Sequence, residues 1–129
     1  MFGAGISWFV VENLSINVEL NGYYTSQPVQ DTGGGNFNLL FRWHFMARET
    51  WSLFIDGGVG LLLTDDDVPH DATSYNFTPQ AGTGLSFDAG DTNRAMIGVR
   101  WHHISNANLD NRNPGRDSLQ VWAGLSMPF

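Results

Sequence analysis

Apolar and polar side chains alternate strictly along most of this chain, and that alternation restricts the possible folds more than any other feature. In the C-terminal stretch 118–129, every second residue is apolar: Leu119, Val121, Ala123, Leu125, Met127 and Phe129. Successive side chains of a β-strand point to opposite faces, so a period of two indicates strands with one apolar face. The same pattern recurs from the first residues onward and predicts an all-β protein.

Seven segments follow this rule: 3–11, 14–24, 36–46, 51–61, 76–87, 94–104 and 118–129. Each is long enough for a tilted membrane crossing, which takes about 9–11 residues, whereas strands of soluble domains average roughly 5–6. The connections alternate between tight ones (12–13, 47–50, 89–93) and longer ones (25–35, 63–75, 105–117). Short turns at one end and long loops at the other are typical of antiparallel transmembrane β-barrels of outer membranes.

The number of strands indicates that the barrel is incomplete at its N-terminal side. Bacterial single-chain barrels have an even number of strands, and about eight is the minimum. The first segment begins at the long-loop end, whereas the last finishes at the short-turn end. We therefore expect residues 1–129 to form one N-terminally truncated barrel domain that has eight strands at full length.

The composition agrees with a membrane barrel and argues against nucleic acid as a partner. Six basic residues oppose 13 acidic ones, for a net charge of −7, whereas nucleic-acid binding depends on clustered Lys and Arg. Only 15% of the residues are charged, while Gly, Trp and Phe are abundant. Cysteine is absent, which excludes disulfides and thiol chemistry. We expect a location in the outer membrane and a membrane as partner.

In such a barrel the apolar phase faces lipid and the polar phase faces a lumen. Eight strands leave a lumen just wide enough for side chains. Buried charges need partners, so we expect the lumenal polar residues to neutralise and hydrogen-bond one another. These residues are Glu19, Arg42, His44, Asp56, Gln80, Arg100 and His102.

The stretch RWHHISNANL, residues 100–109, places two polar residues on the apolar face of segment 94–104. His103 and Ser105 continue the phase of Ala95, Ile97, Val99 and Trp101. Residues i and i+2 of a strand stand about 6.6 Å apart, so a bend at the strand end brings imidazole and hydroxyl within hydrogen-bonding reach. That pair is a base and a nucleophile for acyl transfer, and a nearby acid, Asp110 or Asp117, can orient the imidazole. Alternatively, His103 and Ser105 have no catalytic role and only belong to the polar rim of the barrel, where the hydrocarbon layer of the membrane ends.

The stretch HHISNANLDNRNPGRDSL, residues 102–119, resembles the signature of the lipid A 3-O-deacylases, the PagL family of Gram-negative outer membranes. The matching features are His103, Ser105, Asn106 and Ala107, followed by the Asn113-Pro114-Gly115 turn and Asp117. The family has an eight-stranded barrel with its active site on the outer wall. The resemblance in motif covers about the last 30 residues of the chain. The rest of the chain resembles the family only in its barrel architecture.

The resemblance implies roles for individual residues. It implies that Ser105 is the nucleophile, His103 the general base, and Asp117 the acid that orients the imidazole. The family's acid is usually Glu, and Asp117 is one methylene shorter. Asp110 is therefore kept as an alternative acid. Asn113 matches the asparagine whose side chain donates to the oxyanion in this family, although Asn113-Pro114-Gly115 is equally typical of a tight turn. Asn106 is the second candidate donor, but it is more typical of a residue that holds the loop. Trp101, Leu119 and Val121 become contacts for the acyl chain or, alternatively, ordinary lipid-facing residues.

The implied reaction is hydrolysis of the 3-O-linked hydroxyacyl ester of lipid A in lipopolysaccharide. The implied reaction needs no cofactor and no metal. His44, His102 and His103 resemble metal ligands, but the strand phases place His103 on the other face from His102, so we expect no metal site. Two other functions compete: a non-catalytic small outer-membrane barrel with a structural or adhesive role, and a soluble lipocalin-like carrier. The carrier would turn its apolar phase inward.

Overall fold

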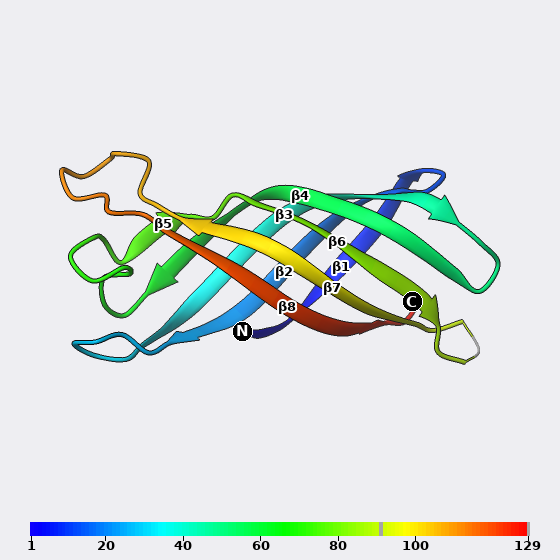
Figure 1. The fold of residues 1–129 in the computed structure, drawn as a ribbon, viewed down its shortest axis with the longest axis horizontal. Coiled ribbons are helices and arrows are strands. Elements are labelled where there is room, and N and C mark those ends of the chain that lie inside the picture. Colours follow the sequence, from blue (N-terminus) through cyan, green and yellow to red (C-terminus); the bar gives the residue numbers. More distant parts are fainter. Residues whose placement is uncertain (91, 129) are drawn as a thin grey trace.

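The computed structural model describes residues 1–90 and 92–128, which form a single antiparallel sheet (Figure 1). Its strands are β1 (Phe2–Val11), β2 (Leu14–Thr25), β3 (Thr32–Ala47), β4 (Trp51–Thr64), β5 (Tyr75–Phe77), β6 (Gln80–Asp88), β7 (Arg94–Ile104) and β8 (Arg116–Ser126). The order across the sheet is β1-β2-β3-β4-β6-β7-β8, with β5 paired to β4. The structure thus confirms the predicted all-β, antiparallel architecture.

The predicted strand 76–87 is interrupted, which accounts for eight strands where the sequence indicates seven. β5 and β6 both pair with β4, and Thr78 and Pro79 lie between them. Proline has no backbone N–H to donate to a ladder, so regular pairing stops there. Thr78 still exchanges two backbone hydrogen bonds with Gly60 on β4, of 2.9 and 3.0 Å. β5 and β6 therefore follow one path along β4, and the sheet is seven strands wide.

The sheet is curled but not closed among the described residues. β1 pairs with β2 and β8 pairs with β7, and no pairing joins β1 to β8 in residues 1–90 and 92–128. The ribbon wraps so that β7 and β8 pass in front of β1 and β2 (Figure 1). The further strand expected before residue 1 stays a prediction.

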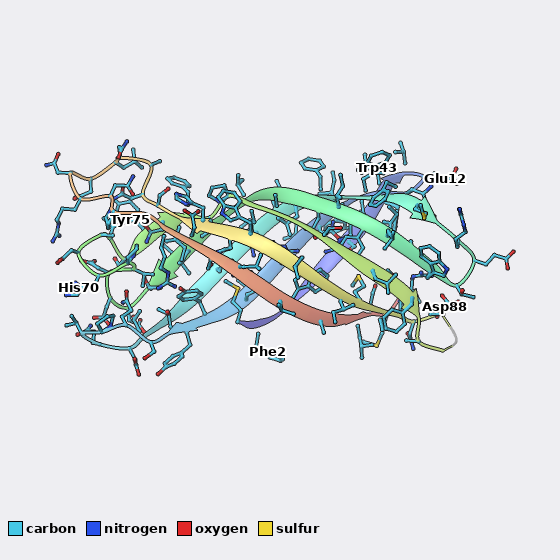
Figure 2. All side chains as sticks on the ribbon, in the orientation of Figure 1. Phe2, Glu12, Trp43, His70, Tyr75 and Asp88 are labelled. Carbon is cyan, nitrogen blue, oxygen red and sulfur yellow. The ribbon has the colours of Figure 1, made fainter. Side chains whose placement is uncertain are left out.

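The long loops gather at one end of the molecule and the tight turns at the other (Figure 1). His70 and Tyr75 mark the long-loop end, whereas Glu12, Trp43 and Asp88 mark the short-turn end (Figure 2). The loop predicted over 25–35 is wrong in part, because β3 begins at Thr32. Gly33, Gly34 and Gly35 pair with β2 instead of forming the loop. A Cβ on Gly34 would clash with the Leu63 carbonyl oxygen, so glycine permits this close strand contact.

Other boundaries differ little from the sequence expectation. β7 has the predicted bounds, Arg94–Ile104, while β8 begins two residues early, at Arg116, and ends at Ser126. Phe129, assigned to the last apolar phase, lies outside the described residues. No helix long and apolar enough to cross a bilayer occurs in the part of the chain that the structure describes.

The apolar phase points outward and the polar phase points into the curled sheet. On β3, Phe37, Leu39, Phe41 and Trp43 are 40–53% exposed, while Asn38 and Arg42 between them are at most 5% exposed. Large exposed apolar side chains occur on all the long strands (Figure 2). A soluble carrier barrel needs the opposite arrangement, so the lipocalin-like hypothesis is wrong.

A buried ion-pair network fills the middle of the interior. Asp56 on β4 accepts hydrogen bonds from Arg42 on β3 at 2.8 Å and from Arg100 on β7 at 2.9 Å. Arg100 also pairs with Glu19 on β2 at 3.2 Å. The Asp56 side chain is 0% exposed, and the two arginine side chains are 6% and 7% exposed. The predicted mutual neutralisation of lumenal charges is therefore present at these residues.

Aromatic and amide side chains complete this interior layer. The Arg42 guanidinium lies 4.5 Å from the ring centre of Phe54, and Arg100 lies 5.3 Å from that of Trp122. Gln80 donates to Asn38 at 2.6 Å. Through its ion pair with Glu19, Arg100 links β7 to β2 across the interior. Asp56 links β4 to both β3 and β7 through its two arginine partners. These contacts hold the curled sheet in shape.

Replacing Asp56 with alanine should lower the free energy of unfolding by about 3–5 kcal/mol, because two buried arginines lose their shared partner. Urea unfolding of the protein refolded in detergent micelles measures this. Asp88→Ala is the matched control, since Asp88 pairs with Arg94 at 2.8 Å but is half exposed, and its loss should cost about 0–1 kcal/mol. Equal losses in the two variants would contradict the buried-network interpretation.

Candidate active site

His103 and Ser105 lie at the long-loop end of β7 on the outward face. Both are partly exposed, whereas His102, Ile104 and Asn106 between and beside them are at most 1% exposed. The strand alternation thus continues past Ile104, where β7 ends, into the first loop residues. Imidazole and hydroxyl share the face that carries Val99 and Trp101.

The backbone around His103 and Ser105 is held by the interrupted strand β5–β6. His103 N donates to Pro79 O at 3.0 Å. Phe77 N donates to Ser105 O at 2.7 Å, and Ser105 N donates to Phe77 O at 3.1 Å. These bonds keep Ser105 extended beyond the end of β7. Sequence reasoning did not identify Phe77 and Pro79 as part of the site, because nothing local relates them to residues 103–105.

Asp117 meets His103 because the two are directly opposite in the β7–β8 register. His103 Nδ1 lies 2.8 Å from Asp117 Oδ1. A carboxylate only accepts hydrogen bonds, so Nδ1 carries the hydrogen and Nε2 is left as the basic nitrogen of a neutral imidazole. Asp110, the alternative acid, instead accepts a 3.1 Å bond from Arg112 N within the loop.

Trp101 forms a second contact to the same carboxylate. Its Nε1–H donates to Asp117 Oδ1 at 3.0 Å. Its ring also stacks on the His103 imidazole, with centroids 5.9 Å apart and an interplanar angle of 24°. Trp101, His103 and Asp117 therefore form one connected cluster on the outer wall.

Ser105 and His103 do not share a hydrogen bond among the contacts of the described residues, and Ser105 interacts there through its backbone. The spacing of alternate residues on a strand, about 6.6 Å, accounts for this. Catalytic hydrogen bonds are often long before a substrate is bound and tighten in the complex. The structure thus brings Asp117 to His103 and places Ser105 next along the same face.

An asparagine network shapes the loop between β7 and β8. Asn106 N donates to Asn113 Oδ1 at 3.0 Å, and Asn113 Nδ2 donates to Asn108 Oδ1 at 2.9 Å. The Asn106 side chain is fully buried, donates to Arg112 O at 2.7 Å and accepts from Asn108 N at 3.0 Å. Both asparagines that were candidate oxyanion donors therefore have contacts that hold the loop.

Gly115 ends this loop beside the imidazole. Its φ of +62° lies in the left-handed region that glycine tolerates best. A Cβ added there would stand 3.3 Å from His103 Cε1 and 3.7 Å from Nε2. The Pro114-Gly115 pair signals the turn in the sequence, but only the register shows that the turn packs against His103.

An apolar surface adjoins the cluster. Leu119 is opposite Trp101 in the β7–β8 register, and Val121 is opposite Val99. Trp101, Leu119 and Val121 are 44%, 73% and 74% exposed. Around the cluster and elsewhere in residues 1–90 and 92–128, no group of three or more His, Cys, Asp or Glu side chains is arranged to hold a metal ion.

Comparison with known proteins concerns nearly the whole chain. The model of the family described as "Lipid A 3-O-deacylase (PagL)" matches residues 2–126. The chain belongs to this family. The resemblance that residues 102–119 indicate is thus confirmed, and so is the fold class of an antiparallel outer-membrane-type β-barrel, although the described sheet is not closed.

A curated relative within the PagL family is the "Lipid A deacylase PagL" of Pseudomonas aeruginosa. It is 32% identical over 113 residues, which cover 80% of this chain. The matched part spans 63% of the relative's own length. No solved structure matches this PagL-family chain.

Replacing Gly115 with alanine should lower the free energy of unfolding by about 1–2 kcal/mol, because an L-residue is forced into the left-handed region. Gly90→Ala, at φ +90° with no atom of residues 1–88 and 92–128 within 4 Å of its Cβ position, should give a similar loss. Gly35→Ala is the neutral control, since it has neither a positive φ nor a neighbour within 4 Å. Denaturant unfolding of all three checks this, and a Gly115→Ala protein as stable as Gly35→Ala would contradict it.

Proposed function

We propose that the protein is a lipid A deacylase, an esterase that removes the 3-O-linked hydroxyacyl chain in the outer leaflet of the outer membrane. Membership of the PagL family and the name of the Pseudomonas aeruginosa relative, a lipid A deacylase, support the substrate class. The observation that carries the proposal is the 2.8 Å contact between His103 and Asp117 on the outward face, with Ser105 next on that face.

The reaction follows the logic of a Ser-His-acid triad. His103 Nε2 accepts the proton of the Ser105 hydroxyl while Ser105 Oγ bonds to the ester carbonyl carbon. Asp117 keeps the hydrogen on Nδ1 and stabilises the imidazolium that forms. The tetrahedral intermediate then collapses, the ester bond breaks, and His103 returns the proton to the departing 3-oxygen of the sugar.

The second half of the reaction releases the fatty acid. Water attacks the acyl-Ser105 carbonyl, His103 accepts its proton, and Ser105 leaves with that proton as a hydroxyl. The products are a 3-hydroxy fatty acid and lipid A with a free 3-hydroxyl. All the atoms balance with water as the only co-reactant, so the reaction requires no cofactor.

An outer-wall location suits a substrate that never leaves the membrane. The long-loop end of the barrel would face the cell exterior, since long loops are external in outer-membrane barrels. Lipid A would then lie beside β7 and β8, with its ester at the height of His103 and Ser105. The exposed Trp101, Leu119 and Val121 would contact the acyl chain.

Replacing Ser105 with alanine should abolish deacylation. Mass spectrometry of lipid A from cells expressing the full-length protein should show loss of one hydroxyacyl group, and cells expressing Ser105→Ala should retain it. Ser74→Ala, the same change in another loop at the long-loop end, is the control and should behave as wild type. Retention of the hydroxyacyl group with both proteins would favour a non-catalytic barrel, whereas its loss with both would rule out Ser105 as the nucleophile.

Replacing Asn113 separates its two candidate roles. Asn113→Ala should reduce kcat by about 100- to 1,000-fold if its amide stabilises the oxyanion. Asn113→Asp keeps the oxygen that accepts from Asn106 N but removes the N–H donor together with its bond to Asn108 Oδ1, so it should be nearly as inactive. Asn108→Gly loses only that loop bond and should keep near-normal kcat. Asn111→Asp, the same charge change in the same loop, is the control. Near-normal kcat in Asn113→Asp would leave Asn113 only its loop-holding role.

A further inference from the structure

We propose that Trp101 is a positioning residue for the hydrolysis: its indole N–H holds the Asp117 carboxylate in the orientation that His103 requires. This inference rests on the proposed deacylase function and deepens it. It gives Trp101 a role that its apolar surface alone does not suggest, because the sequence pattern makes Trp101 a lipid-facing or acyl-contacting residue.

The Asp117 carboxylate has little else to hold it. Its side chain is 65% exposed, so packing does not fix its rotamer. In the described part of the chain its hydrogen-bond donors are the Trp101 indole at 3.0 Å and the His103 imidazole at 2.8 Å, both directed at Oδ1. Without the indole, the carboxylate is free to rotate toward solvent and leave the imidazole unoriented.

The register explains why tryptophan suits this position. Trp101 and His103 are alternate residues of β7 on one face, and Asp117 is directly opposite His103 on β8. Asp117 is therefore diagonal to Trp101, a relation that spans roughly 7–8 Å between backbones and requires a long side chain. Among the aromatic residues that suit a lipid-facing position, phenylalanine has no donor, whereas the indole carries its N–H at the ring edge.

The indole also orients the base directly. Its ring stacks on the His103 imidazole at 24°, with centroids 5.9 Å apart. The aromatic face favours a cation, so the stack stabilises the imidazolium that forms when Ser105 loses its proton. Trp101 thus contacts both partners of the His103–Asp117 pair and fixes their relative geometry before the substrate arrives.

Kinetics distinguish positioning from acyl-chain contact. A residue that only grips the chain contributes equally to the ground and transition states, so its loss raises KM and leaves kcat unchanged. A residue that positions the triad acid acts on the chemical step, so its loss lowers kcat. Trp101→Phe retains the ring and removes the N–H, and thereby separates these two effects.

The test uses the full-length protein refolded in detergent micelles with purified lipid A as substrate. Trp101→Phe should lower kcat about 10-fold, as expected for one hydrogen bond to a charged group, with KM changed less than about twofold. Trp43→Phe is the matched control, since Trp43 is 52% exposed on the outer face at the short-turn end (Figure 2). A raised KM with normal kcat in Trp101→Phe would overturn the proposal.

A double-mutant cycle tests whether Trp101 acts through Asp117. Asp117→Ala removes the acceptor of the indole N–H, so adding Trp101→Phe to it should change kcat less than about twofold, whereas the same change in the wild type costs about 10-fold. Additive losses would overturn the proposal, because they mean that Trp101 acts independently of the acid.

The activities of the wild-type protein and of Ser105→Ala distinguish a failure of this inference from a failure of the proposed function. Wild-type hydrolysis together with an inactive Ser105→Ala protein upholds the deacylase, and Trp101→Phe then decides the positioning role alone. If Ser105→Ala is as active as wild type, the proposed triad is overturned, and the positioning role with it. Circular dichroism and thermal unfolding of Trp101→Phe and Trp43→Phe should agree, so that a folding defect cannot imitate a loss of kcat.

Discussion

The structure depends on the alternation of side chains across each strand, combined with an interior that must satisfy its own charges. Apolar residues in one phase produce an outward face suited to lipid, and the other phase forces Arg42, Asp56 and Arg100 into a space where water is scarce. Charges buried in that way are stable only with partners. The interior ion pairs therefore follow from the same pattern that makes the outer face apolar, and they connect strands that are distant in the sequence.

The candidate site uses the same alternation on the outer face. His103 and Ser105 share a phase with Trp101, while the neighbouring His102 is buried on the opposite face. A one-residue shift of β7 would exchange these two sets completely. The interrupted strand β5–β6 secures the register through Phe77 and Pro79, and β8 supplies Asp117 directly opposite His103. The chemistry that we propose thus relies on strand pairing more than on the loop.

The loop contributes in a different way. Its asparagines hydrogen-bond to one another, and Gly115 takes a left-handed conformation beside the imidazole. This arrangement keeps the chain that enters β8 close to His103. It also buries Asn106 completely, with its side-chain amide hydrogen-bonded to Arg112 O, whereas Asn113 is partly exposed and donates to Asn108 Oδ1.

The sequence alone predicts most of the strands, their outward and inward faces and the family, because side-chain periodicity and the motif at residues 102–119 are local properties. It also identified His103, Ser105 and Asp117 as candidates but left Asp110 open. The folded chain shows which acid contacts the imidazole, that β5 and β6 separate at Thr78 and Pro79, and that Gly33 to Gly35 belong to β3. It also joined the Trp101 indole to Asp117. These features depend on the register between strands, which brings together residues that no local pattern in the chain relates.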